Sequence, residues 1–223
     1  MTRVAKRGLA GRPATQPEIN RFRRASLIRA ALEVVAREGI ENTTIARICA
    51  GANVSSGLAA HYFENKEDLL AQAFARLLDD VSEATGRAAA RVEGPKAKLL
   101  AIYSTVFSDD VYSDVARSAY LTFWAASLTS PVLLEINRAA YLRFHAAIEG
   151  LFARAAAEAG VAIDARAAAI GLNGLSDGLW LDLSIGVDDF TRADAIRACS
   201  EFVENALAPR QQGQRRKRKG KQI

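Results

Sequence analysis

Aromatic and acidic side chains lie close together in two segments of the second half of the sequence, where they could hold a cation. Tyr120, Phe123 and Trp124 fall in one apolar stretch, and Trp180 closely follows Asp177 in another. The faces of aromatic rings attract cations and a carboxylate adds opposite charge, so such a set could form a cage around a quaternary ammonium ion. The alternative is that these rings fill the core of a helical bundle.

The other residues that often carry chemistry are poorly placed for catalysis or metal binding. His61 and His145 lie in different halves of the chain, and Cys49 and Cys199 are also far apart. No Gly-rich phosphate loop, zinc-protease motif or nucleophile elbow is present. We therefore expect no enzyme activity, no metal site and no cofactor, and we interpret both cysteines as small buried hydrophobes in a reduced protein.

The composition predicts a helical protein with a sizeable core. Half of the 223 residues are hydrophobic, with only 15 glycines and 5 prolines, and no stretch alternates polar and apolar residues as a strand would. The N-terminus lacks the apolar core of a signal peptide, and the longest apolar stretch, around 119–128, is too short to span a bilayer. We therefore expect an all-α, cytoplasmic protein with no membrane partner.

The positive charge is concentrated at the two ends of the chain. Residues 1–24 hold seven basic residues and one acidic residue, and residues 209–223 hold seven basic residues and no acidic one. Within a total of +5, the ends therefore carry +13 and the body between them carries −8. This distribution indicates flanking basic tails on an acidic body rather than a broad basic surface.

Helical periodicity and capping residues predict about nine helices. Gly39 and Gly160 are expected to end the first and seventh, while Asp164 and Thr191 are expected to cap the eighth and ninth. The predicted helices cover about 20–38, 44–52, 55–63, 66–90, 96–107, 113–128, 131–159, 164–186 and 191–207.

The strongest local pattern lies in residues 43–70. Thr43 and Thr44 are good N-cap residues before a short apolar run, and Asn53 accepts a left-handed turn at little cost. Ser55 or Ser56 can then cap the next helix. Two helices joined by so short a turn cross steeply, which leaves the second one able to lie in a DNA major groove.

This segment resembles the DNA-binding unit of the TetR family of bacterial repressors. Asn53 stands where most relatives have glycine, and Gly51 where they have a larger residue. The motifs that carry the resemblance are Thr-Thr-Ile at 43–45, Asn53-Val54-Ser55, His61-Tyr62-Phe63 and the run 66–70 that opens the next helix. The resemblance implies a three-helix helix-turn-helix domain at 21–65 and a helical ligand-binding and dimerisation domain at 66–208. The basic segments 1–20 and 209–223 are expected to be disordered.

The resemblance also implies which side chains meet DNA. Those expected to face the major groove are Ser55, Ser56, Gly57, Ala60 and His61, and those expected to hold phosphates are Tyr62, Lys66, Thr43 and Thr44. A helix N-terminus with its hydroxyls suits an anion. Because the second helix is poor in Arg, Lys, Gln and Asn, we expect readout by His61, methyl contacts and DNA shape. The alternative for His61 and Tyr62 is packing inside the three-helix core.

Arg12 adds a further candidate DNA contact. The run Gly11-Arg12-Pro13 resembles the core of an AT-hook, in which an extended arginine enters a narrow minor groove. Its place ahead of a helix-turn-helix unit matches the layout of homeodomain arms. The alternative is a solvated basic tail with only nonspecific phosphate attraction.

The aromatic segments carry a second, narrower resemblance. The runs 121–127 and 177–181 are similar to the sensing domain of the BetI branch, whose members respond to choline. The resemblance implies a ligand site that includes Tyr120, Phe123, Trp124, Asp177 and Trp180.

The last two predicted helices suggest a dimer interface. Glycine inside a helix is costly unless something approaches closely. The resemblance implies that these helices pair with those of a second subunit across a two-fold axis, and the alternative is packing within one chain. The candidate interface residues are Gly171, Gly174, Leu175, Gly178, Phe202 and Val203.

These features predict a homodimeric transcriptional regulator, a repressor whose partners are a double-stranded DNA operator and a small-molecule effector such as choline or another cation. A first alternative is an architectural DNA-binding protein in which the basic tails dominate binding. A second is an enzyme built on a helical bundle, although no residue set supports it.

Overall fold

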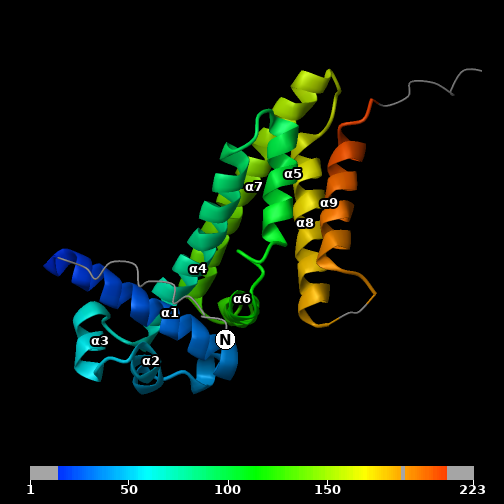
Figure 1. Ribbon diagram of the computed structural model, residues 1–223. Helices are drawn as coiled ribbons and strands as arrows, with labels where there is room; N and C mark the ends of the chain where they lie inside the picture. Colours follow the sequence, from blue (N-terminus) through cyan, green and yellow to red (C-terminus); the bar gives the residue numbers. More distant parts are fainter. Residues whose placement is uncertain (1–14, 187–188, 210–223) are drawn as a thin grey trace, which may run out of the picture. The chain divides into compact units, whose positions relative to one another are not determined.

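The computed structural model of the protein describes residues 15–186 and 189–209, and this part of the chain is helical with no strand (Figure 1). The all-α prediction is therefore confirmed, and the helices fall close to their predicted positions. They are α1 (Gln16–Asn42), α2 (Ile45–Ala52), α3 (Ser56–Tyr62), α4 (Lys66–Ala90), α5 (Pro95–Val106), α6 (Asp114–Ser127), α7 (Pro131–Ala159), α8 (Ala165–Ser184) and α9 (Arg192–Ala206).

Capping side chains fix several helix ends where the sequence placed them. The Asp164 carboxylate accepts a hydrogen bond from the Ala167 backbone N–H at 2.9 Å, and Thr191 Oγ1 accepts one from the Asp194 N–H at 3.3 Å. Gly160, with a φ of 66°, follows the end of α7. Because each group satisfies a backbone atom that the helix itself leaves unpaired, the start or stop is set locally.

The first helix is longer than predicted at both ends. It begins at Gln16, where the Thr15 backbone N–H donates to Glu18 Oε2 at 3.0 Å, so 16–20 is helical rather than part of a disordered arm. Gly39 does break the helix, with φ 76° and ψ 169°, but helical turns resume and reach Asn42. Residues 1–14, including Arg12, and residues 210–223 lie outside the described residues.

The chain divides into two compact units. The first contains residues up to Leu78 together with Asp114–Asn137, and the second contains Asp79–Ser113 together with the chain from Arg138 onward. Helices α4 and α7 contribute to both. This grouping differs from the single predicted body at 66–208, because α6 packs against α1 in the first unit. Such a long-range contact has no local signal in the sequence.

The first unit has its own apolar core. Leu27 and Val34 of α1, Ile48 of α2 and Phe74 of α4 are almost fully buried there. Phe123 of α6 joins them, with its ring stacked on Phe74 at 5.0 Å between centroids and an interplanar angle of 11°. This core holds α2 and α3 against α1 and so fixes the orientation of the helix pair.

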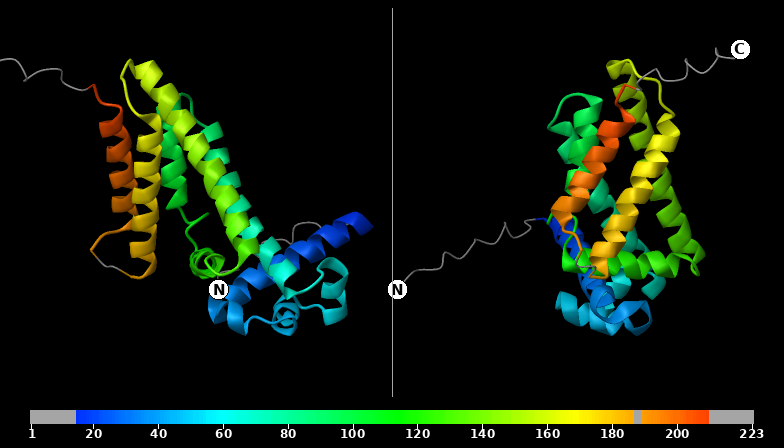
Figure 2. Two further views of the ribbon diagram at one scale, coloured as in Figure 1. Left: turned by 180° about the vertical axis from the view of Figure 1, so that it is seen from behind. Right: turned by 90° about the vertical axis from the view of Figure 1, so that its right-hand side faces the viewer.

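The second unit is a bundle of α5, α8, α9 and the neighbouring parts of α4 and α7. Its fully buried residues include Leu99, Phe152, Leu172 and Cys199. Helices α8 and α9 lie side by side in all views (Figures 1 and 2).

No single helix in the described residues is long and apolar enough to cross a membrane. One pair, α6 and α7, reaches the required length and composition together but is bent by 116° at the break between its helices.

Candidate functional site

The turn between α2 and α3 has the geometry that the sequence predicted. Asn53 adopts the left-handed conformation, with φ 53° and ψ 49°, and its backbone N–H donates to the Ala50 carbonyl at 3.1 Å. The Val54 N–H donates to the Cys49 carbonyl at 3.0 Å. Ser55 then occupies the N-cap of α3 without a side-chain capping bond. The Ser55 hydroxyl is therefore not used to cap the helix, so capping does not compete with binding to an external partner.

One face of α3 is open to solvent and the other is buried. The exposed residues are those predicted to face the groove, namely Ser55, Ser56, Gly57, Ala60 and His61. Ala59 and Phe63 are buried against α1 and α4, at 2% and 4% exposure. His61 thus lies outside the core, which disagrees with the alternative that its side chain packs inside the three-helix unit. At Gly57 a Cβ would meet nothing within 4 Å, so the fold itself does not require glycine there.

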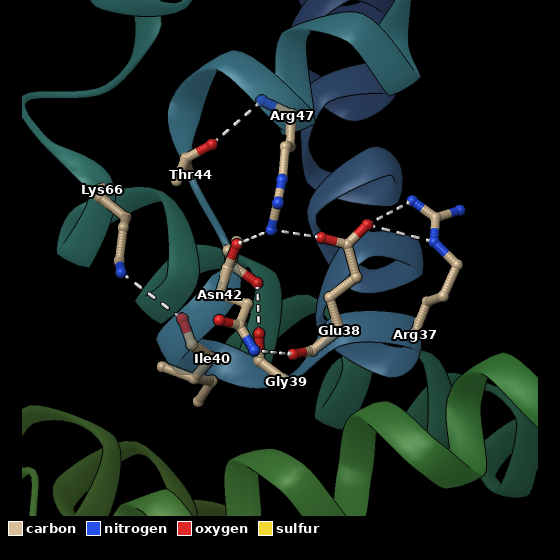
Figure 3. Close-up of polar contacts among 9 residues, drawn as sticks. Arg37, Glu38, Gly39, Ile40, Asn42, Thr44, Arg47 and Lys66 are labelled. Atoms are coloured by element: carbon tan, nitrogen blue, oxygen red, sulfur yellow. Dashed lines mark hydrogen bonds and ion pairs between the residues drawn. The ribbon is translucent and has the colours of Figure 1, made fainter.

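Tyr62 and Lys66 bind within the unit. The Tyr62 hydroxyl donates to Asn20 Oδ1 at 3.0 Å, and the half-buried ring lies edge-on to His61 at 5.0 Å. Lys66 Nζ donates to the Ile40 carbonyl at 3.4 Å, as Figure 3 shows. Both contacts tie α3 and the start of α4 to α1. A lysine has further donors, so this contact leaves Lys66 able to bind a phosphate as well.

The two adjacent threonines have different roles. Thr43 is fully buried, and its hydroxyl donates to the Gly39 carbonyl at 2.7 Å. The prediction that Thr43 holds a phosphate is therefore wrong, because its side chain closes the end of α1 inside the unit. Thr44 is exposed and caps α2, with Oγ1 accepting from the Arg47 backbone N–H at 3.3 Å (Figure 3).

An ion-pair network that the sequence did not reveal holds the α1–α2 corner (Figure 3). Arg47 donates to Glu38 Oε2 at 2.7 Å and to the Asn42 carbonyl at 2.6 Å. Arg37 donates to the other oxygen of Glu38 at 3.0 Å. The Glu38 side chain is 25% exposed and joins two guanidinium groups, so the network braces the corner while both arginines stay accessible.

The predicted ligand residues are divided between the two units. Tyr120, Phe123 and Trp124 belong to the first, and Asp177 and Trp180 belong to the second. Phe123 is fully buried against Phe74, as the core alternative expects, and its assignment to a ligand site stays a prediction. Tyr120 packs partly buried against the same core, whereas Trp124 is 43% exposed.

In the second unit, Trp180 packs edge-on to Tyr112, with 5.3 Å between the ring centroids and an interplanar angle of 81°. The Tyr112 hydroxyl lies 3.1 Å from Ser184 Oγ on the next turn of α8. These contacts hold the indole between α8 and the segment after α5, which agrees with a core role for Trp180.

Asp177 has partners on α7 that the sequence did not indicate. Its Oδ2 accepts a hydrogen bond from the Tyr141 hydroxyl at 3.1 Å, and the Tyr141 ring lies 5.9 Å from the ring of His145. Although the residue keeps an exposed edge, packing around the carboxylate raises the pKa of Asp177, against the lowering effects of Tyr141 and His145. The signal that could have found this group is the four-residue spacing of Tyr141 and His145 on a helix.

The same unit contains a buried polar pair between α5 and α8. The Tyr103 hydroxyl donates to Asn173 Oδ1, and the two residues are 2% and 3% exposed. Burial, followed by the nearby Cys199 and Asp177, raises the pKa of the Tyr103 hydroxyl far above its ordinary value. The Asn173 Nδ2 atom is buried without a hydrogen-bond partner.

A separate cleft of about 280 Å³ lies between α8 and α9. Half of its lining residues are charged, and none of them is a predicted ligand residue. The lining residues are Leu179, Phe190, Asp194, Arg197, Ala198 and Glu201.

The predicted dimer residues fall into two groups. Gly174 and Gly178 are exposed, and a Cβ on either would meet nothing within 4 Å. Contacts within the chain explain the glycine at position 171, because a Cβ added there would lie 2.8 Å from the Phe202 ring. Val203 is 1% exposed, so its placement at an interface is wrong: the side chain belongs to the core of its own chain. Leu175 is likewise packed against that core.

The fold and the α3 surface define a class of protein, the helix-turn-helix DNA-binding regulators. The comparisons with known proteins agree. Residues 27–73 match the bacterial regulatory proteins of the tetR family, and residues 95–208 match the C-terminal domain of BetI-type transcriptional repressors.

Curated relatives match over nearly their whole length. The transcriptional regulator BetI of Burkholderia mallei is 33% identical over 190 residues, covering 85% of this chain and 95% of the relative. BetI of Pseudomonas paraeruginosa is 36% identical over 189 residues, covering 84% and 94%. The chain therefore belongs to the TetR family of transcriptional regulators, in its BetI-type branch.

Solved structures share the fold. A transcriptional regulator from Pseudomonas aeruginosa PAO1 has a TM-score of 0.72 and 29% identity, over 86% of this chain and 92% of its own. A regulator from Saccharomonospora viridis, solved in complex with choline, has a TM-score of 0.74 and 21% identity, over 82% and 96%.

Proposed function

We propose that the protein is a homodimeric repressor that a small organic cation releases from its operator. The observation that supports DNA binding most directly is the exposed face of α3, with its small side chains and His61 held on a rigid helical unit. Small residues at the start of a recognition helix permit close approach to base edges. The TetR family membership and the BetI-type second half support the regulatory role.

The dimer proposal rests on an exposed apolar stripe along α8. Ile170, Leu181 and Ile185 are 54%, 38% and 67% exposed, and they share the helix face with Gly174 and Gly178. Side chains at this spacing face one direction on a helix, and such a stripe is a common feature of subunit contacts. Two copies would also provide the paired recognition helices that a palindromic operator requires.

A bulky side chain on this stripe tests the dimer. Gly174→Trp should shift the protein toward monomer in sedimentation velocity, because a large ring blocks the approach of the partner. Gly86→Trp on α4 is a matched control, since Gly86 is also exposed and a Cβ there also meets nothing within 4 Å. A dimer that persists in Gly174→Trp would remove this face of α8 from the interface.

Choline is the first effector to test, because a structural neighbour was solved with choline and the curated relatives are BetI regulators. In the proposed mechanism, effector and operator compete through a coupling free energy of about 1–3 kcal/mol. Helices α4 and α7 both contribute to the two units, and α4 is the connection through which we propose that effector binding in the second unit biases the first.

The decisive experiment is fluorescence anisotropy of labelled DNA from upstream of this protein's own gene, with and without choline. Tight binding that resists competitor DNA and weakens with choline supports the whole proposal. Tight binding that is indifferent to choline supports the regulator and excludes this effector. Equal, weak binding to every DNA contradicts the operator-specific role.

The basic ends of the chain are proposed to add salt-dependent affinity. Removal of 209–223 deletes seven basic residues, so the slope of log affinity against log salt should become shallower by up to about 0.9 for each lost phosphate contact. An unchanged slope would show that the tail takes no part in DNA binding.

A further inference from the structure

Polar side chains from α5, α7 and α8 form one group inside the second unit, here termed the polar cluster: Tyr103, Tyr141, His145, Asn173 and Asp177. Direct contacts join Tyr103 to Asn173 and Tyr141 to Asp177. Asn173 and Asp177 are four residues apart on α8, so they lie on neighbouring turns of the same helix face. The two contact pairs are therefore adjacent rather than separate.

The inner end of the polar cluster has an unmet hydrogen-bonding requirement. Asn173 is 3% exposed, and its Nδ2 has no partner while its Oδ1 accepts from Tyr103. Exchanging the amide nitrogen and oxygen would leave the oxygen unpaired instead, so the requirement persists in either orientation. Folded proteins rarely leave such a group unpaired, and each case calls for an explanation. A hydroxyl group can donate or accept and would satisfy either orientation.

The outer end of the polar cluster is acidic and bordered by rings. The Asp177 carboxylate keeps an exposed edge, accepts a hydrogen bond from Tyr141 and interacts electrostatically with His145, both on α7. The ring of His145 borders it beside Tyr141, and Phe144 packs edge-on to Tyr103 at 6.3 Å. An exposed carboxylate among aromatic rings attracts a cation and repels an anion.

We propose that the polar cluster is the effector site, with Asp177 attracting a small organic cation and the Asn173–Tyr103 pair binding a hydroxyl group on the same ligand. The ligand class is therefore a hydroxyl-bearing cation rather than any quaternary ammonium ion. This inference rests on the proposed function only in assuming that the protein has a cationic effector. It places recognition on Tyr103, Tyr141 and Asn173, which sequence analysis did not identify.

Calorimetry with three ligands of similar size separates the two recognition elements. Choline has the charge and the hydroxyl, tetramethylammonium lacks the hydroxyl, and 3,3-dimethylbutan-1-ol lacks the charge. The full-length protein should bind choline about tenfold more tightly than either other ligand, since one buried hydrogen bond or one charge contact is lost in each. Equal affinity for choline and tetramethylammonium would overturn the role of the Asn173–Tyr103 pair.

Variants of α8 test the placement. Asp177→Asn should weaken choline binding at least tenfold and leave operator binding unchanged, because the isosteric amide removes only the charge. Asp182→Asn is the matched control, since it removes a carboxylate from the same helix outside the polar cluster. If both variants bind choline as the unmodified protein does, Asp177 is not the cation contact and the proposal fails.

The double variant Tyr103→Phe with Asn173→Leu tests the buried end. Replacing both partners by apolar groups is compatible with folding, whereas removing one partner leaves the other unpaired. The double variant should retain its helical circular dichroism and operator binding but lose the preference for choline over tetramethylammonium. A retained preference would assign the pair a purely structural role and overturn the inference.

Failure of this inference and failure of the proposed function give different results. Calorimetry requires no DNA, and operator binding requires no effector. Operator binding without affinity for choline or tetramethylammonium would overturn the effector site and preserve the regulator. Choline binding that depends on Asp177, without any specific operator, would preserve the site and reject the repressor.

Discussion

The DNA-binding surface and the polar cluster satisfy their polar groups in opposite ways. On the first unit the buried polar group Thr43 bonds to the backbone, while the groups proposed to meet DNA lie on the exposed face of α3. In the second unit the unpaired polar atom of Asn173 is inside. The DNA-binding surface therefore forms without a partner, whereas the polar cluster leaves a buried atom that a ligand can pair; a second such atom, Asn137 Oδ1, lies on α7 in the first unit.

The two regions also differ in how their residues are assembled. The DNA-binding surface comes from one contiguous run, so substitutions there should separate folding from recognition residue by residue. The polar cluster draws on three helices, so its substitutions should affect binding and stability together. Four experiments test this difference.

The largest expected effect is at Gly57. Gly57→Leu should lower operator affinity by about 100-fold, because a branched side chain would occupy the space where α3 approaches the base edges. The free energy of unfolding should change by less than about 0.5 kcal/mol, since a Cβ at Gly57 meets nothing within 4 Å. Anisotropy and urea denaturation measure the two quantities. Unimpaired operator binding would remove Gly57 from the interface.

Thr43→Val should show the reverse pattern. Loss of the hydroxyl leaves the Gly39 carbonyl without its side-chain donor, so the free energy of unfolding should fall by about 1–2 kcal/mol. Operator affinity of the folded protein should change less than twofold, because Thr43 is fully buried. Urea denaturation and anisotropy at low temperature separate the two effects. A large loss of operator affinity with an unchanged free energy of unfolding would show that Thr43 does contact a phosphate.

The two cysteines report separately on the two units. Cys49 is 3% exposed in the first unit and Cys199 is 1% exposed in the second. Burial raises the pKa of both thiols, that of Cys199 to about 11. Labelling with a thiol reagent at pH 8 should therefore follow local opening. Operator DNA should slow the labelling of Cys49 more than that of Cys199, and choline should slow the labelling of Cys199 a few-fold more than that of Cys49. Variants that keep only one of the two cysteines would measure each rate separately. Equal protection by both ligands would mean that the units open as one.

The smallest effect is a gain in stability from Asp177→Asn. The folded-state pKa of Asp177 is raised above 3.8, so its ionised form costs stability at pH 7 and this cost disappears as the pH falls through the raised pKa. The variant should therefore have a higher midpoint of thermal unfolding at pH 7, by at most about 2 °C because solvent screens the carboxylate. The two proteins should converge toward pH 4 in scanning calorimetry. A lower midpoint would assign Asp177 a structural role.

Local signals predicted the turn in the first unit and several helix caps in the second. The turn could be predicted from the backbone preference of Asn53 alone. Asp164 and Thr191 could be predicted as caps because the groups they bind lie in the next turn of helix. Thr43 was predicted incorrectly because its partner, Gly39, becomes available only when α1 continues past the glycine. The break at Gly39 was visible in the sequence, but the resumed helix was not.

The contacts that were missed are those between distant segments. Phe123 has the composition of a ligand-site ring, and only the packing of α6 on α1 places it against Phe74. Tyr141 and Asp177 meet because α7 and α8 are neighbours, which periodicity cannot show. Sequence patterns thus identified Asp177 as a candidate but not the residues that surround it.

The break at Gly39 also determines what effect missense substitutions at this position have. Its backbone, with φ 76° and ψ 169°, lies in a region that essentially only glycine occupies. Every missense codon at this position should therefore reduce the amount of regulator in the cell and act as a recessive, loss-of-dosage allele. Missense codons at position 57 should leave abundant protein, which in the proposed homodimer would pair with normal subunits and inactivate them, so those alleles should be dominant.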